Sequence, residues 1–330
     1  MDELQALLHT RAELLDRDVP TARLRAGNEG DWHRVQRGVY VPRDAVRELW
    51  PQADLRLRIV ASLSRMRGGN AVVSHASAAV VHGLSLSGIA HRPVEMTVAG
   101  GGRMSSRPGL KRHLDELTPD DVVEVDGIRC TSLERTVFDV ARTAPLETGV
   151  SCADAAARRV AVQGRTLLAD AQEGWRDRLR LRAAAAAGHR GVARARWVIE
   201  FMDGRAESPG ESLSRLQLFR LGFRSFELQM AVEGPTGEPY EIDIGLPDEK
   251  ILWEFDGEGK YTDAALRSGR SLEDILLREK RREEWIRGVT QWRFLRGGFR
   301  DVTTPEALAT RLAAFGVPLP NSRDHTRSSR

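Results

Sequence analysis

Apolar positions recur with two different periods along this chain, and the period separates helical from extended segments. Near the N-terminus, helical spacing occurs in DELQALLH and RAELLDRD, and PTARLRAGN has the pattern of a short basic helix. The next stretch, DWHRVQRGVYVP, alternates as two short strands around Arg37-Gly38. Three short helices followed by a hairpin predict a winged helix-turn-helix over residues 1–45, a motif that inserts its second helix into the major groove of DNA.

The basic side chains of this segment would form its DNA-binding face. They are Arg23, Arg25, His33, Arg34, Arg37 and Arg43. The same pattern also fits a small helical cap whose arginines are simply solvated, so the segment alone leaves both interpretations open.

Residues 46–145 mix the two periods and predict an α+β region. Within it, Arg135 and Asp139 lie one helical turn apart and are expected to form an intrahelical ion pair. His75 and His82 are separated by two turns, about 10.5 Å along a helix, which is too far for both to bind one metal ion. We therefore expect packed or capping roles for both histidines.

The remaining chain divides by composition. Residues 146–204 are rich in Ala and Arg and predict a helical connector, which fits either contact with phosphate or simple solvation. Residues 205–317 carry strong helix and strand patterns and form the last predicted domain. The segment 318–330 is polar, and we expect it to be a disordered tail.

The segment 205–317 begins with a clear helix start, since Ser208 suits the N-cap and Pro209 the first helical position. Glu211 then falls in the first turn. The strand candidates YEIDIG and ILWEFDG follow, joined by the turn-like GLPDEK, and they predict a hairpin. Alternation puts Tyr240, Ile242 and Ile244 on one face of the first strand.

By the same alternation, Asp243 of the first strand and the Glu254/Asp256 pair of the second can meet on one face of the hairpin, within reach of Glu211. Two carboxylates about 5 Å apart repel by roughly 3 kcal/mol at an effective dielectric constant of 20. Such a cluster persists if it is solvated, partly protonated, or bound to a cation, and Mg²⁺ is the natural partner of carboxylate oxygens. The pattern thus indicates either a metal site or the solvated face of a hairpin.

Composition narrows the class of protein. A chain of 330 residues with 41% hydrophobic and 29% charged residues is typical of a soluble protein of two or three domains, and a net charge of +3 does not by itself favour nucleic acid. Cys130 and Cys152 form no CxxC pair, which favours reduced thiols and no zinc site. The start has no signal-peptide pattern, and no apolar run approaches the roughly 20 residues that span a bilayer. We expect a cytoplasmic protein without membrane contact.

A Glu in a helix, an Asp in a strand, a turn and a Glu in the next strand resemble the PD-(D/E)XK nuclease superfamily. A domain of unknown function related to very-short-patch repair endonucleases is similar in sequence to three segments of this chain, GESLSRLQLFRLGF, VEGPTGEPYEIDIGLPDEKILWEFDGEGKYT and EKRREEWIRG. The N-terminal part resembles the AbiEi-type antitoxin and transcriptional regulator family through WHRVQRGVYV, VVSHASAAVVHGL and TSLERTVFDVAR.

The nuclease resemblance implies a restriction-endonuclease-like α/β sandwich in which Glu211, Asp243 and Glu254 are catalytic carboxylates that bind Mg²⁺ or Mn²⁺. The superfamily's lysine would fall at position 256, where this chain has Asp256. Lys260, after a glycine-containing turn, is the favoured substitute. Asp256 itself is a candidate further metal ligand.

Two functions follow from these patterns. The first is a DNA-binding, metal-dependent endonuclease in a mixed α/β multidomain chain, and cutting both DNA strands would favour a homodimer. Cations for its DNA backbone contacts would come from one predicted helix and the strand after it, through Lys280, Arg281, Arg282, Arg287, Arg293, Arg296 and Arg300. Interleaved Glu residues also fit a solvated helix face. The second function is a non-catalytic regulator or antitoxin that binds operator DNA or a cognate toxin and keeps a vestigial nuclease fold. Lys280 is a second substitute for the missing lysine.

Overall fold

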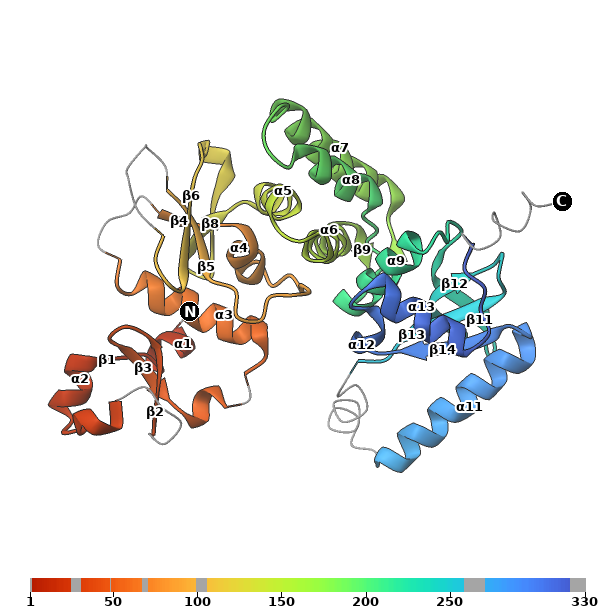
Figure 1. Ribbon diagram of the computed structural model, residues 1–330, viewed down its shortest axis with the longest axis horizontal. Helices are drawn as coiled ribbons and strands as arrows, with labels where there is room; N and C mark the ends of the chain where they lie inside the picture. Colours follow the sequence, from red (N-terminus) through yellow and green to blue (C-terminus); the bar gives the residue numbers. More distant parts are fainter. Residues whose placement is uncertain are drawn as a thin grey trace. The chain divides into compact units, whose positions relative to one another are not determined.

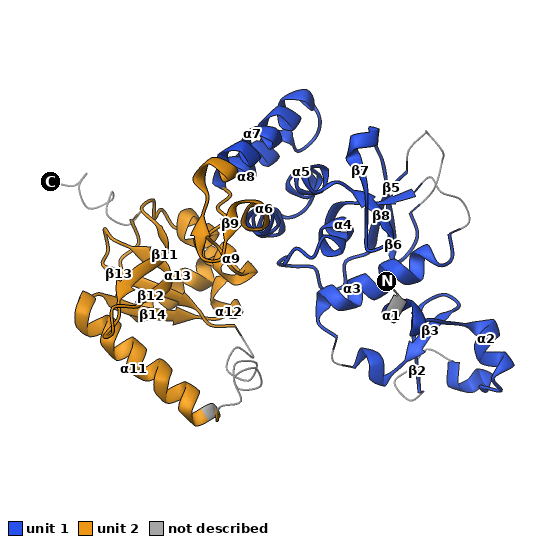
Figure 2. Cartoon of the chain, turned by 180° about the vertical axis from the view of Figure 1, so that it is seen from behind, with its two compact units in different colours: residues 1–156, 173–201 blue, residues 157–172, 202–330 orange. Residues whose placement is uncertain are grey.

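The chain forms two compact units, each built from helices and β-sheets (Figure 2). The computed structural model describes residues 2–24, 31–47, 49–66, 71–98, 106–257 and 271–320, so most of the predicted tail, 321–330, lies outside the described residues. The first unit is Met1–Ala156 with Glu173–Phe201, and the second is Ala157–Gln172 with Met202–Arg330. The mixed α/β class predicted from the sequence is confirmed. All three boundaries between the units fall within residues 146–204, the predicted helical connector.

The N-terminal part of the first unit contains the predicted short helices and hairpin. Its elements are α1 (Asp2–Ala6), β1 (His9–Thr10), α2 (Arg11–Asp16), the 3₁₀ helix η1 (Thr21–Leu24), β2 (Trp32–Gln36), β3 (Val39–Pro42) and η2 (Asp44–Val46). The strands pair antiparallel in the order β1-β3-β2. Leu14, Leu24 and Tyr40 form a small core of their own, packed by Val19 and Trp32. The short helices are thereby fixed against the hairpin.

A five-stranded sheet with the order β6-β5-β4-β8-β7 forms the centre of the first unit (Figure 1). Its elements are α3 (Pro51–Leu63), β4 (Ala71–Val73), α4 (His75–Val81), β5 (Val94–Val98), β6 (Leu110–Leu114), η3 (Pro119–Asp121), β7 (Val122–Val125), β8 (Ile128–Thr131) and α5 (Leu133–Thr143). The central strand β4 lies antiparallel to β5 and parallel to β8. Helix α4 is buried along its whole length, as its Ala- and Val-rich sequence requires.

Residues 146–201 are mainly helical, as the sequence predicts. These elements are α6 (Leu146–Ala161), the short hairpin β9 (Val162–Gln163) and β10 (Thr166–Leu167), α7 (Ala169–Ala185) and α8 (Val192–Phe201). Helices α6 and α7 each contain a boundary between the two units.

The second unit has a four-stranded sheet with the order β11-β12-β13-β14. Its elements are α9 (Pro209–Arg220), β11 (Glu227–Glu233), β12 (Pro239–Leu246), β13 (Ile251–Phe255), α11 (Leu272–Thr290), β14 (Arg293–Gly297), α12 (Phe299–Val302) and α13 (Pro305–Ala314). Strands β11, β12 and β13 pair antiparallel, which confirms the predicted β12–β13 hairpin. Strand β14 returns through the long helix α11 and pairs parallel to β13 at the edge of the sheet.

The apolar faces of this sheet differ in one respect from the sequence prediction. Tyr240 and Ile242 pack in one apolar cluster, whereas Ile244 packs in the other, so the three residues do not share a face. The change falls at Asp243, a position opposite Gln229, whose φ of +51° interrupts the regular pairing of β11 with β12. The prediction failed because simple alternation assumes an undistorted strand.

Strand β13 is buried on both faces. Ile251, Trp253 and Phe255 belong to the larger apolar cluster, and Leu252 to the smaller one. A carboxylate on such a strand cannot be part of a solvated hairpin face, so that interpretation is wrong for Glu254. Within the described ranges, no helix is both long and apolar enough to cross a membrane.

Candidate functional site

The start of α9 brings one carboxylate against the sheet. The Ser208 hydroxyl accepts a hydrogen bond from the backbone N–H of Glu211 at 3.2 Å, and Pro209 occupies the first helical position, as predicted. A Cβ atom on Gly210 would overlap the ring of Phe255. Glycine therefore permits the close approach of α9 to β13 that places Glu211 at the sheet.

Glu211 is 7% exposed, and both of its carboxyl oxygens accept hydrogen bonds. Oε1 accepts from the Ser208 hydroxyl at 2.8 Å, while Oε2 accepts from the backbone N–H of Glu207 at 2.8 Å and from Nε2 of Gln229 at 3.1 Å. Burial, followed by the negative charge of Asp243, raises the pKa of Glu211 to about 8. The helical and strand carboxylates are therefore close enough to repel each other, as the sequence predicted.

Strand pairing brings Asp243 beside the next carboxylate. The last paired residues of β12 and β13 are Ile244 and Trp253, and one further step of the same register sets Asp243 opposite Glu254. Oδ2 of Asp243 accepts a hydrogen bond from the backbone N–H of Phe255 at 2.7 Å. This bond holds the Asp243 carboxylate at the point where β13 ends.

Glu254 is 6% exposed and is paired with two arginines. Nη2 of Arg282 on α11 lies 2.7 Å from its Oε1, and Nη2 of Arg296 on β14 lies 3.4 Å from its Oε2. Both arginines also bind Glu279. Arg296 reaches this place because Glu254 and Arg296 are direct partners in the parallel β13–β14 ladder.

Asp243 and Glu254 line a pocket of about 360 Å³ within the second unit, whereas Glu211 is not among its lining residues. Its described lining contains six carboxylates and three guanidinium groups, and so carries an excess of negative charge. The charged lining residues are Glu207, Glu241, Asp243, Glu254, Asp256, Glu279, Arg165, Arg282 and Arg296. Asp256, the residue at the expected lysine position, thus lies at the same pocket as Asp243 and Glu254.

The chemistry of this donor set fits a hard divalent cation, since carboxylate oxygens are the ligands that Mg²⁺ and Mn²⁺ prefer. A cation beside Glu211 and Asp243 would relieve their repulsion, which adds to the effect of burial in raising the pKa of Glu211. A cation at Glu254 would compete with Arg282 and Arg296. Among the described residues, no three acidic, histidine or cysteine side chains are already arranged around one metal position.

The other predicted site residues lie away from this pocket or outside the described residues. Lys260 and Arg25 belong to ranges that the structure does not describe. Lys280 and Arg281 are exposed on α11 and do not line the pocket, in contrast to their neighbour Arg282. Of the helix residues predicted to bind nucleic acid, Lys280 and Arg281 therefore face solvent, whereas Arg282 forms an ion pair with Glu254.

In the N-terminal hairpin, Arg34 and Arg37 are exposed. Arg23 forms an exposed ion pair with Asp31 at 3.0 Å. These positions suit contact with a phosphate backbone, but exposed arginines are equally ordinary on a solvated surface.

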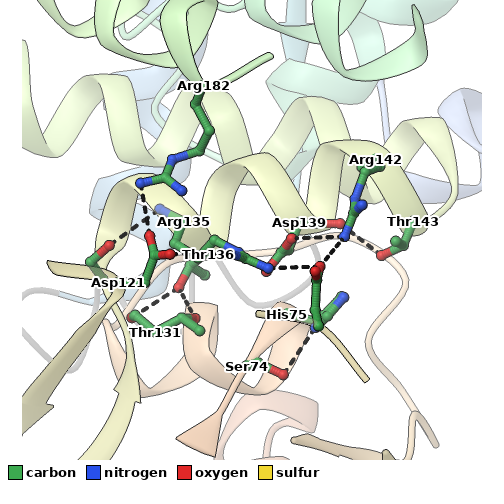
Figure 3. A network of polar contacts seen from close by, with 12 residues as sticks. Ser74, His75, Asp121, Thr131, Arg135, Thr136, Asp139, Arg142, Thr143 and Arg182 are labelled. Atoms are coloured by element: carbon green, nitrogen blue, oxygen red, sulfur yellow. Dashed lines mark hydrogen bonds and ion pairs between the residues drawn. The ribbon is translucent and has the colours of Figure 1, made fainter. Parts of the chain in front are cut away.

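The first unit contains a separate buried ionic network centred on Arg135 (Figure 3). Its guanidinium lies 2.7 Å from Asp115, 3.2 Å from Asp121 and 2.8 Å from Asp139. The Arg135–Asp139 pair confirms the sequence prediction, whereas the other two partners come from distant segments. Arg142 adds contacts to Asp115 and Asp139. Burial raises the pKa of Asp139 above its usual value, so this carboxylate depends on its arginines.

Both histidines singled out in the sequence are packed in this unit. Nε2 of His82 lies 2.8 Å from the carbonyl oxygen of Thr131, and Nδ1 of His75 lies 2.9 Å from the Ser74 hydroxyl. Cys130 and Cys152 are buried free thiols, as predicted.

Sequence reasoning missed the hydrogen bond from Gln229 to Glu211 and the pairing of Arg296 with Glu254. The only available signal for Gln229 was a polar residue within an alternating strand. Arg296 could be recognised as a cation for phosphate, but its carboxylate partner depends on which strand lies beside β14.

Comparison with known proteins gives relatives without an assigned function. No family model matches the chain. Two relatives from Mycobacterium tuberculosis, "Uncharacterized protein Rv2248" of strain H37Rv and "Uncharacterized protein MT2308" of strain CDC 1551, are each 29% identical over 228 residues, which is 68% of this chain and 73% of theirs. The crystal structure of the RV2827C protein from the same species covers 71% of this chain and 87% of its own, with 13% identity and a TM-score of 0.36. That likeness is too low to carry an argument.

Proposed function

We propose that the second unit is a restriction-endonuclease-like domain that hydrolyses DNA phosphodiester bonds with the help of Mg²⁺ or Mn²⁺. The observation that carries this proposal is the proximity of three carboxylates from one helix and two neighbouring strands. Asp243 and Glu254 line one negatively charged pocket, and Glu211 lies near enough to Asp243 for that charge to raise the Glu211 pKa. The helix, strand and strand origins of the three carboxylates agree with the order in the nuclease superfamily that the sequence resembles.

In this proposal, Asp243 and Glu254 would hold the cation, with Asp256 and Glu211 beside them. When bound, a divalent cation neutralises charge on a phosphodiester and lowers the pKa of a coordinated water. Arg282 and Arg296 hold the Glu254 carboxylate in one orientation.

Protonation of Glu211 reduces the negative charge close to Asp243. With its pKa raised to about 8, this carboxyl group keeps a proton near neutral pH, and negative charge beside Asp243 is reduced. Protonation of Glu211 thus reduces its repulsion with Asp243, and ion pairing balances the charge of Glu254.

A second candidate is a non-catalytic DNA-binding regulator or antitoxin with a cognate toxin as partner. The specific observation in its favour is that Glu254 is already engaged by Arg282 and Arg296, while Asp256 replaces the catalytic lysine. The helices and hairpin of the N-terminal segment are compatible with the DNA-binding role in either case.

The decisive experiment is calorimetric titration of Mn²⁺ and Mg²⁺ into the full chain, with cleavage of supercoiled plasmid measured on the same samples. We expect Asp243→Asn and Glu254→Gln to abolish both metal binding and cleavage. Asp248→Asn is the matched control, because Asp248 is exposed in the turn between β12 and β13 and does not line the pocket.

Metal binding without cleavage would favour the regulator. No metal binding by the wild-type chain would refute the nuclease proposal. A loss of cleavage in Asp248→Asn equal to that in the pocket variants would also count against it, because charge alone would then explain the effect.

A further inference from the structure

A second pocket of the second unit, of about 350 Å³, is positively charged. Its lining comes from the edge strand β14, the C-terminal half of α11 and the end of α13. Its lining residues are Glu283, Arg287, Arg293, Phe294, Leu295, Arg296, Arg311 and Phe315. Four guanidinium groups and one carboxylate therefore share this pocket.

Backbone carbonyl oxygens orient two of these arginines, and no carboxylate of the described residues neutralises their charge. Nη1 of Arg293 donates hydrogen bonds to the carbonyl oxygens of Phe315 at 3.3 Å and Gly316 at 2.9 Å. Nε and Nη2 of Arg311 donate to the carbonyl oxygen of Arg296 at 3.0 and 2.8 Å. Within the described part of the chain, neither Arg293 nor Arg311 forms an ion pair with a carboxylate.

Carbonyl oxygens carry only partial charge, so both guanidinium groups keep their attraction for an anion. Arg287 adds a third cation, since its side chain is 61% exposed and lies 3.6 Å from Glu283. Exposed pairs of this length are worth little and exchange readily. Guanidinium groups held in place are well suited to bind the oxygens of a phosphate.

An aromatic ring lies beside these cations. Phe315 is 45% exposed, and the guanidinium of Arg311 sits 4.9 Å from the centre of its ring. An exposed aromatic side chain next to phosphate-binding arginines is the arrangement by which proteins bind single-stranded nucleic acid, with a base stacked on the ring.

Arg296 lines both this basic pocket and the acidic pocket that contains Glu254. The two pockets therefore adjoin each other across one side chain of β14.

We propose that the basic pocket is a binding subsite for a phosphate of a single nucleic-acid strand, with an adjacent base stacked on Phe315. Its place beside the acidic pocket as a substrate subsite rests on the proposed nuclease function. Binding itself does not, because no metal and no bond cleavage are needed for guanidinium groups to hold a phosphate.

The test uses the full chain and a fluorescein-labelled single-stranded DNA of 20 nucleotides, with binding followed by fluorescence anisotropy in the presence of EDTA. We expect the double variant Arg293→Gln/Arg311→Gln to raise the Kd at least about tenfold, and the slope of log K against log salt to fall by about 0.7 for each phosphate that an arginine no longer neutralises. Phe315→Ala should weaken binding without changing that slope, since a ring carries no charge.

Arg224→Gln is the matched control. Arg224 is exposed in the same unit, donates to the carbonyl oxygens of Phe219 and Phe223, and lies 4.2 Å from the Phe219 ring, yet it lines neither pocket. We expect its Kd to stay within about twofold of wild type.

An equal loss of affinity in Arg224→Gln and the double variant would overturn the proposal, because any surface arginine would then serve. If the double variant does not fold, as circular dichroism would show, Arg287→Gln decides: unchanged affinity and salt slope there refute the subsite. Displacement of the probe by AMP at the concentration at which unlabelled strand displaces it would assign the pocket to a free nucleotide, and would refute strand binding.

The result is separable from that of the nuclease proposal. Arginine-dependent binding with no plasmid cleavage would refute the nuclease proposal and support the phosphate subsite. Plasmid cleavage together with binding that is insensitive to substitution of Arg287, Arg293 and Arg311 would support the nuclease proposal and refute the subsite.

Discussion

Replacing Glu211 by Gln should remove a pH-dependent cost to the stability of the second unit. In the unfolded chain this carboxyl group titrates near its ordinary pKa of 4.5, whereas in the folded chain burial and Asp243 raise the pKa to about 8. Below pH 4.5 the group is protonated in both states and contributes no difference. Between the two values only the unfolded state has released the proton, so folding becomes less favourable as pH rises.

The size of the effect follows from the two pKa values. At pH 7 the cost is about 3 kcal/mol, and above pH 8 it levels off at about 5 kcal/mol, both to order of magnitude. Glutamine cannot ionise, so the Glu211→Gln variant lacks this pH dependence. Relative to the ionised carboxylate, whose two oxygens both accept, glutamine loses one accepted hydrogen bond, and that loss costs roughly 1–3 kcal/mol.

The assay is urea unfolding of both proteins across the window from pH 4.5 to 8, followed by circular dichroism and tryptophan fluorescence, since Trp253 is fully buried in this unit. We expect the difference in unfolding free energy to move in favour of Glu211→Gln as pH rises. Glu284→Gln, at an exposed position of α11, should follow the wild type. Saturating MgCl₂ should flatten the wild-type curve, because a cation stabilises the ionised carboxylate.

Parallel curves for wild type and Glu211→Gln over this window would refute the reasoning. Parallel curves would mean that ionising Glu211 in the folded protein costs no free energy. Glu211 would then be either solvated or paired with a compensating positive charge.

Three further outcomes can be measured directly. Gly210→Ala should lower the unfolding free energy by about 1–3 kcal/mol, because the new Cβ would overlap the ring of Phe255; unchanged stability in urea unfolding would show that α9 does not approach β13 so closely. Arg135→Met should cost about 3–5 kcal/mol by leaving buried Asp139 with less compensation, and a loss below 1 kcal/mol in the same measurement would show that Arg142 suffices alone. Arg282→Gln should tighten Mn²⁺ binding about tenfold in calorimetry, roughly 1.4 kcal/mol, because it frees Glu254 from its shorter ion pair; equal or weaker binding would contradict competition between cation and arginine.

The local features of the second unit could be predicted from the sequence. Ser208 and Pro209 define the helix start through backbone capping, and the β12–β13 hairpin follows from two alternating runs joined by a short turn. Because these features depend on neighbours in the chain, the proximity of Asp243 to Glu254 was also predictable. The same holds for the Arg135–Asp139 pair, which needs only one helical turn.

Other features depend on which distant segments become neighbours, and only the tertiary structure decided them. Arg296 meets Glu254 because β14 pairs with β13 in parallel, an arrangement that no local pattern specifies. Gln229, at φ +51°, shifts the faces of β11 and β12 at Asp243, which the regular period of 2 cannot anticipate.

The electrostatic character of the two pockets has the same origin. The sequence shows a helix of alternating charge, but burial decides that Arg282 neutralises a carboxylate while Lys280 beside it faces solvent. Among the described residues, Arg293 and Arg311 have no carboxylate partner, because folding places backbone carbonyl oxygens beside their guanidinium groups. Sequence thus determined which charged groups are present and which local elements carry them. Tertiary packing determined which of those charges cancel, since ion pairing depends on distances in space that the order of residues does not contain.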